Sequence, residues 1–102
     1  MENALKTACS VPMSIMRAAA KAIELQKEFA DKGSTLAISD AGVGVAFCKS
    51  ALMGASLNVY INTKSMTDRT YAESIEAESD KLLDIYCKLA DEIYDSVLKR
   101  LR

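Results

Sequence analysis

Apolar residues recur at steps of three and four along most of this chain, a spacing that places them on one face of an α-helix. A first helix is predicted from about Pro12 to Asp31. Residues 2–9 also have a helical pattern, so Pro12 either begins this helix or kinks a longer one. Gly33 is expected to end it in the left-handed conformation. The core-facing stripe is expected to consist of Ile15, Ala18, Ala22, Leu25 and Phe29.

A second helix is predicted from about Asp40 to Lys64, after a short connection over residues 34–38. Ser39 is expected to cap it, with Asp40 in the first turn, where the helix dipole favours an acid. Its interior has many small residues, namely Ala41, Gly42, Gly44, Ala46, Ala51, Gly54, Ala55 and Ser56. Small residues suit close approach of another backbone. We therefore expect this helix to be buried on most sides, with Gly54 and Ala55 lying against another backbone.

A third helix is predicted from about Asp68 to Leu101, capped by Thr67 or Asp68. Its inner stripe is expected to be Leu82, Tyr86, Leu89, Ile93 and Val97. The outer face carries the acid-before-base pairs Asp84–Lys88 and Asp95–Lys99, which support a helix at this spacing. Such a helix would measure about 50 Å, more than a three-helix unit is expected to cover. Part of it is therefore expected to pack on another chain.

Composition favours an all-α fold. The chain has 102 residues, of which 50% are hydrophobic and only 6% aromatic, enough for one small domain with an aliphatic core. One Pro and four Gly are too few turn residues for a many-stranded β fold. We predict a single helical unit over residues 1–102, a bundle of about three main helices. Because helices of this total size bury only about 60–65% of their unfolded surface, we expect oligomerisation to complete the bundle, as a homodimer with the second helix near its interface.

Charge and residue types exclude several function classes. The formal net charge of −1 gives no electrostatic case for nucleic acid. The absence of His removes His-dependent nucleophilic catalysis and most zinc sites, so no metal site is expected. The three cysteines are widely spaced and read as reduced thiols of a cytoplasmic protein. No signal region begins the chain, and no apolar run approaches the ~20 residues that cross a bilayer, so no membrane partner is expected.

Two asparagines give the strongest polar signal. Asn58 and Asn62 lie four residues apart on one face of the second helix, in a segment, 41–67, that holds two bases and no acid. A carboxamide offers a donor and an acceptor, which suits recognition of a heterocycle edge such as that of a pterin. Alternatively, both amides bond neighbouring backbone or pair across a helix interface.

Three further residues are candidates for binding. Ser39 and Asp40 either contact a ligand or merely cap the helix. Asp40 and Asn58 share a stripe, but a straight helix would separate them by about 27 Å. Only a break near Gly54 or a symmetric dimer would bring them together. Lys64 can hold a carboxylate or donate a proton, or it can simply satisfy the helix end. No motif assigns a catalytic residue.

Three segments that follow one another along the chain carry a family resemblance. They are Ile38-Ser39-Asp40-Ala41-Gly42-Val43, Gly54-Ala55-Ser56-Leu57-Asn58-Val59-Tyr60-Ile61-Asn62 and Lys64-Ser65-Met66-Thr67-Asp68. This run resembles the cyclodeaminase domain of formimidoyltransferase-cyclodeaminase and its stand-alone bacterial relatives, some described as methenyltetrahydrofolate cyclohydrolases. The resemblance implies an all-helical dimer that takes a tetrahydrofolate derivative as substrate and needs no metal or redox cofactor. It also implies that the matched Asn58, Asn62, Ser39 and Asp40 are pocket residues; beside them, Lys64 is a candidate for attracting a glutamate tail.

The family's domain is about twice as long as this chain, which resembles its second half alone. The Pro-Gly-Gly-Gly and acidic segments of the first half have no counterpart here. We therefore expect a folate-metabolising module of the formimidoyltetrahydrofolate cyclodeaminase or methenyltetrahydrofolate cyclohydrolase type. We expect it to be incomplete as an isolated chain, with a separate chain supplying the other half. The alternative is a truncated paralogue that serves as a non-catalytic helical dimerisation or interaction module.

Overall fold

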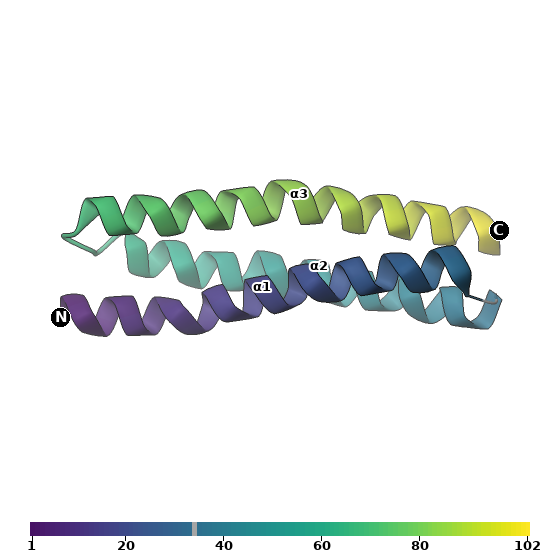
Figure 1. The fold of residues 1–102 in the computed structure, drawn as a ribbon, viewed down its shortest axis with the longest axis horizontal. Coiled ribbons are helices and arrows are strands. Elements are labelled where there is room, and N and C mark those ends of the chain that lie inside the picture. Colours follow the sequence, from purple (N-terminus) through teal and green to yellow (C-terminus); the bar gives the residue numbers. More distant parts are fainter. Residues whose placement is uncertain (34) are drawn as a thin grey trace.

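Three long antiparallel helices make up the fold, as the computed structural model shows (Figure 1). The structure describes residues 1–33 and 35–102, with the backbone alone for residues 35 and 36. Helix α1 spans Glu2–Lys32, α2 spans Thr35–Thr63 and α3 spans Arg69–Leu101. They form a rod of 51 × 18 × 17 Å. The all-α prediction is confirmed, and no strand occurs in the described ranges.

Helix α1 is continuous from Glu2, so of the two alternatives for Pro12 the longer helix is the correct one and the start near Pro12 is not. Pro12 lies inside the helix and is buried. Gly33 is extended, with φ −81° and ψ 160°, and not left-handed as predicted. Its N–H donates to the Phe29 carbonyl at 2.8 Å. A Cβ on Gly33 would lie 2.6 Å from that carbonyl oxygen, so this approach accounts for the glycine without any positive φ.

The predicted inner stripe of α1 faces solvent. Ile15, Leu25 and Phe29 are 45–59% exposed, and Ala18 and Ala22 are not buried either. The buried positions of α1 form the neighbouring stripe, which consists of Cys9, Pro12, Met13, Met16, Ala19, Ala20, Ile23 and Ala30. Helix α1 therefore has two apolar stripes, and this chain covers only one of them.

Helix α2 begins at Thr35, so Ser39 lies within the helix and is not its cap, contrary to the prediction. The helix starts early because Ile38 packs in register with Ala41 and Val45, and all three are at most 1% exposed. Of the two residues expected against another backbone, Ala55 is buried, which is consistent with that expectation. Gly54 is not: nothing among the described residues lies within 4 Å of the position of a Cβ there.

Helix α3 matches its predicted pattern. The Asp68 carboxylate caps it by accepting the Tyr71 N–H at 3.0 Å. Ile93 and Val97 are buried, and the rest of the inner stripe, Leu82, Tyr86 and Leu89, is half-buried. The expectation that a three-helix unit cannot cover the length of α3 is wrong, whereas the packing of part of α3 on another chain stays a prediction. The helices have 31, 29 and 33 residues, and they lie side by side over the whole rod.

Two apolar clusters divide the core along the rod. One consists of Cys9, Met13, Met16, Ala19, Leu52, Ala55, Val59, Met66 and Ala72. The other consists of Ile23, Ala30, Ile38, Ala41, Val45, Ala90, Ile93 and Val97. Helix α2 contributes to both and packs more extensively on α1 and α3 than these two pack on each other. It is the central helix of the bundle. The expectation that it is buried on most sides is not met within this chain, because its side chains Val43, Phe47, Leu57 and Ile61 are 55–74% exposed.

By length and composition alone, residues 37–63 of α2 could cross a membrane, with a mean hydropathy of 1.3. The expectation from the sequence that no stretch is long and apolar enough is therefore wrong. A third of this stretch is buried within the bundle, and its Lys49 pairs with Asp91 of α3 at 2.7 Å. Helix α2 therefore combines contacts inside the bundle with an apolar surface that this chain leaves exposed.

Candidate functional site

The five candidate residues fall into two groups at opposite ends of α2. Ser39 and Asp40 lie in its first turns, and Asn58, Asn62 and Lys64 lie at its end. Because the helix is unbroken, about 27 Å of helix axis separates Asp40 from Asn58. A single copy of the chain therefore does not bring the two groups into one pocket.

Asn58 and Asn62 share one face of α2, as the spacing predicts, but they differ in environment. Asn58 is exposed, and its side chain makes no hydrogen bond among the described residues. Asn62 is half-buried, and its Nδ2 donates to the Asn58 carbonyl at 2.7 Å. One N–H of the Asn62 amide thus bonds to neighbouring backbone, which was the alternative to ligand binding. Its Oδ1 and second N–H remain available in the part of the chain that the structure describes.

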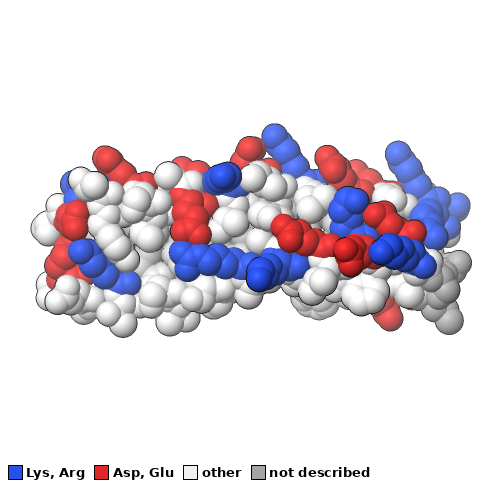
Figure 2. Space-filling view, viewed as in Figure 1, with Lys and Arg blue, Asp and Glu red and all other residues white. Residues whose placement is uncertain are grey.

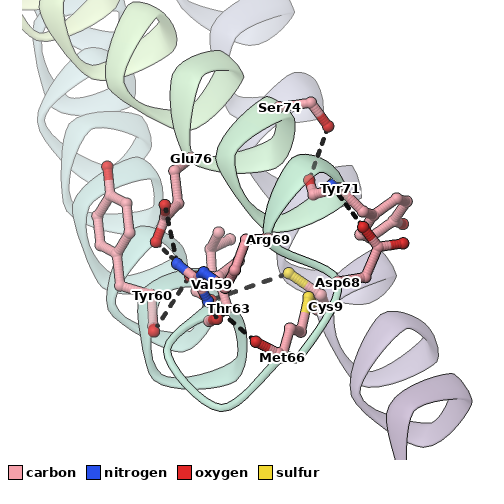
Figure 3. Close-up of polar contacts among 10 residues, drawn as sticks. All are labelled: Cys9, Val59, Tyr60, Thr63, Met66, Asp68, Arg69, Tyr71, Ser74 and Glu76. Atoms are coloured by element: carbon pink, nitrogen blue, oxygen red, sulfur yellow. Dashed lines mark hydrogen bonds and ion pairs between the residues drawn. The ribbon is translucent and has the colours of Figure 1, made fainter.

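The turn between α2 and α3 holds a polar network that the sequence did not reveal (Figure 3). Thr63 is fully buried, and its hydroxyl donates to Glu76 Oε2 at 2.8 Å and lies 3.3 Å from the Tyr60 carbonyl. Arg69 Nη1 donates to the carbonyls of Thr63 and Met66 at 2.7 and 3.1 Å. Arg69 therefore satisfies the free carbonyls at the end of α2. Lys64, the residue considered for that role, is exposed and has no ion-pair partner within the described ranges.

A second network joins the same end of α2 to α3. The Tyr60 hydroxyl donates to the Asp80 carboxylate, and buried Ser79 Oγ lies 3.1 Å from the Tyr60 hydroxyl. Burial, and then the hydrogen bond to Asp80, raise the pKa of Tyr60. The phenol is thus neutral at physiological pH and acts here as a structural donor.

Glu2 ties the start of the chain to the same turn. Its carboxylate accepts the backbone N–H groups of Thr67 and Asp68, each at 2.9 Å. The Asp68 carboxylate in turn accepts from Tyr71 N and, at 3.0 Å, from Lys6 Nζ. The backbone hydrogen bonds come first among the causes that lower the pKa of both Glu2 and Asp68.

Acidification is expected to loosen this end of the rod. A carboxyl whose pKa is lowered by folding stabilises the folded state above its unfolded pKa, 4.5 for Glu2 and 3.8 for Asp68. That contribution is lost as pH falls through the lower folded-state pKa. Thermal melts followed by circular dichroism should therefore give a melting temperature that falls below about pH 4.5. Glu2→Gln should make that fall shallower, and an unchanged pH profile in this variant would contradict the assignment.

A groove of about 380 Å³ lies between α2 and the second half of α3. Its lining is Ser39, Gly42, Val43, Ala46, Phe47, Ser50, Tyr94, Val97, Leu98 and Leu101. The volume suits a small molecule, and the apolar walls with a few hydroxyl groups are typical of such sites. Ser39 is the one sequence-predicted candidate that lines it, and the paired asparagines do not.

Surface charge is balanced. Figure 2 shows acidic and basic side chains intermixed along the visible face, without a broad patch of one sign. Arg17 and Glu78, for example, form a bidentate pair between α1 and α3 with N–O distances of 2.7 Å. Among the described residues, no group of three or more His, Cys, Asp or Glu side chains could hold a metal ion.

Comparison with known proteins adds two findings. A family model described as formiminotransferase-cyclodeaminase matches residues 1–81, which cover α1, α2 and the first part of α3. A curated protein of Methylorubrum extorquens, methenyltetrahydrofolate cyclohydrolase, is 39% identical over 101 residues. The alignment covers 99% of this chain and 49% of that protein, so the chain spans about half the length of this relative.

Proposed function

Because the chain belongs to the formiminotransferase-cyclodeaminase family, we propose that it is a folate-metabolising module that contributes half of a cyclodeaminase or cyclohydrolase site. The observation that carries this proposal is the 39% identity, which extends over nearly the whole chain to a methenyltetrahydrofolate cyclohydrolase. The proposed substrate is a tetrahydrofolate derivative bearing a one-carbon unit between two nitrogens.

The end of α2 supports recognition of such a substrate. Asn58 and the unused groups of Asn62 offer donors and acceptors of the kind that a pterin edge requires. Lys64 is exposed beside them, in a segment without acids, and suits a glutamate carboxylate. Ring closure and ring opening at the bridging carbon require an oriented ligand and proton transfer, and this chemistry needs no redox cofactor. We propose that the protein works without one.

We propose that another polypeptide segment completes the site, and the alignment of the chain with about half of its relative supports this. A homodimer and a separate chain that supplies the other half are both consistent with this need. We propose a cytoplasmic protein, and Cys9, Cys48 and Cys87 are all free thiols.

Folate binding is expected to depend on Asn58. Asn58→Leu should weaken binding of 5-formyltetrahydrofolate at least about tenfold, because a buried ligand amide loses its hydrogen-bond partner. The fold should be unaffected, since the Asn58 side chain is exposed. Calorimetric titration measures the affinity, and thermal melts check the fold.

Asn3→Leu is the matched control, because Asn3 is also an exposed asparagine but lies on α1. It should bind as the parent does. Equal affinity of the parent and the Asn58 variant would remove Asn58 from the site. No folate binding and no methenyltetrahydrofolate hydrolysis by the parent, alone or mixed with a chain equivalent to the other half of the relative, would contradict the proposed function.

The second candidate function is a non-catalytic interaction module. The exposed apolar side chains of α1 and α2 favour it, because monomeric proteins rarely leave such continuous surface uncovered. This function would apply to a chain that associates but neither binds nor converts folate, whether it is alone or mixed with a chain equivalent to the other half of the relative.

A further inference from the structure

The link between α2 and α3, residues 64–68, has all of its backbone N–H groups bonded. The first three donate to carbonyls in the last turn of α2 at 3.0–3.2 Å. The other two donate to the Glu2 carboxylate, each at 2.9 Å. Surface connections are usually the more mobile and variable parts of a fold. This link is instead held in one conformation by contacts on both of its sides.

Arg69, the first residue of α3, fixes the carbonyl groups of the link (Figure 3). Its Nη1 donates to the Thr63 carbonyl at 2.7 Å and to the Met66 carbonyl at 3.1 Å. The Met66 side chain anchors the same segment in the core, where it is 3% exposed. Removal of the guanidinium group would take away both carbonyl contacts and loosen the first half of the link.

The Arg69 guanidinium group is itself held by a carboxylate. Arg69 Nη2 lies 3.9 Å from Glu76 Oε1. The other oxygen of that carboxylate, Oε2, accepts from the hydroxyl of buried Thr63 at 2.8 Å. Two carbonyls and one carboxylate of the chain therefore surround the guanidinium group. Its charge and its donors are engaged within the protein and are not offered to a ligand.

Lys64, the first residue of the link, has the opposite character. Its side chain is exposed and has no ion-pair partner in the part of the chain that the structure describes. Its backbone N–H, in contrast, donates to the Tyr60 carbonyl at 3.0 Å. The backbone of Lys64 is thus fixed while its ammonium group is free. Binding of an anion then has to order the side chain alone, which lowers the entropic cost of binding.

We propose that Arg69 is a positioning residue for substrate binding. It does not touch the ligand, and it holds the link so that Lys64 meets a carboxylate of the glutamate tail of a tetrahydrofolate derivative. The ligand in this inference rests on the proposed function, whereas the hold of Arg69 on the link rests on its contacts. Without Arg69 the ammonium group of Lys64 would still be present, but the link would have to be ordered when the ligand binds.

Amide hydrogen exchange tests the hold on the link without any ligand. Arg69→Met should speed exchange at Ser65 and Met66 about five- to tenfold, the change expected for the loss of one hydrogen bond. Arg17→Met is the matched control, because the Arg17 guanidinium group also bonds across helices, to Glu78. It should leave exchange in the link unchanged. Exchange at Ser65 and Met66 that is the same in the parent and the Arg69 variant would overturn the proposal.

A double-mutant cycle tests whether Arg69 acts through Lys64, with 5-formyltetrahydrofolate as the probe in calorimetric titrations. Lys64→Met should weaken binding at least about tenfold, the loss of one charge-assisted hydrogen bond. Arg69→Met should weaken it about fivefold. The double variant should bind as Lys64→Met does, because without the ammonium group the position of the link no longer affects binding. Arg17→Met should bind as the parent does. Thermal melts check that every variant folds, as expected since none of these side chains belongs to the two core clusters.

Two results of the cycle would overturn the positioning role and leave the proposed function standing. One is equal affinity of the parent and the Arg69 variant for the probe. The other is a loss in the double variant that equals the two single losses combined, because Arg69 would then act independently of Lys64. A parent that binds no probe, alone or mixed with a chain equivalent to the other half of the relative, would contradict the proposed function and the positioning role together.

Discussion

Shortening Leu52 to Ala is expected to lower the free energy of unfolding by about 2–5 kcal/mol, the cost of a cavity at a fully buried leucine. Leu52 is 0% exposed and packs in one cluster with Met13, Met16 and Val59. Five residues on, Leu57 is 71% exposed. Leu57→Ala should therefore change the free energy of unfolding of the isolated chain by at most about 0.5 kcal/mol. Urea denaturation measures the free energy of unfolding of both variants. The protein concentration is kept below that at which the chain associates.

The losses of stability in the two variants compare the inner and the outer face of α2. At higher concentration, Leu57→Ala should also become destabilising if its side chain is buried against a second copy, since association then contributes to the measured stability. A large loss at Leu57 that does not change on dilution would contradict the assignment of this residue to the solvent face of the chain.

Enlarging Ala55 to Leu is expected to cost about 1–3 kcal/mol or more, because overpacking a close-packed core forces neighbours apart. Ala55 is 6% exposed within the cluster that contains Met13 and Val59. The neighbouring Gly54→Ala is the control. It adds a methyl group where nothing lies within 4 Å among the described residues, and should stabilise the helix by up to about 1 kcal/mol in the unassociated chain. Thermal melts that coincide for the parent and the Ala55 variant would show that the site tolerates a larger side chain.

The sequence predicts those features of the fold that depend on interactions within one helix. The existence of three helices, the Asp68 cap and the inner stripe of α3 follow from spacing and capping chemistry within one element. The inner face of α1 could not be chosen this way. Both of its stripes are apolar, and the stripe with the larger side chains, Ile15, Leu25 and Phe29, is the exposed one.

The site was predicted only in part for the same reason. Helical spacing placed Asn58 and Asn62 on one face, as the structure has them. The network of Thr63, Glu76 and Arg69 depends on how the turn brings α3 back onto α2, which no spacing within a helix encodes. The two groups of candidate residues at opposite ends of α2 can meet only through a partner chain. Such a contact depends on the surface of the folded bundle, which the spacing of residues along one helix does not reveal.

The opposite placement of the two chain ends determines how the rod would respond to force. The N-terminus lies at one end and the C-terminus at the other, and the rod is 51 Å long (Figure 1). Tension between the termini would pull α1 and α3 in opposite directions along their axes. It would load the side-chain contacts with α2 together in shear, rather than peeling them apart one turn at a time. Glu2 at one end and Arg100, which donates to the Ala30 carbonyl at 2.6 Å, at the other would be strained from the outset. The resistance of the bundle to stretching would therefore depend on how fast these contacts break, which is a property of the unfolding rate and not of the equilibrium stability.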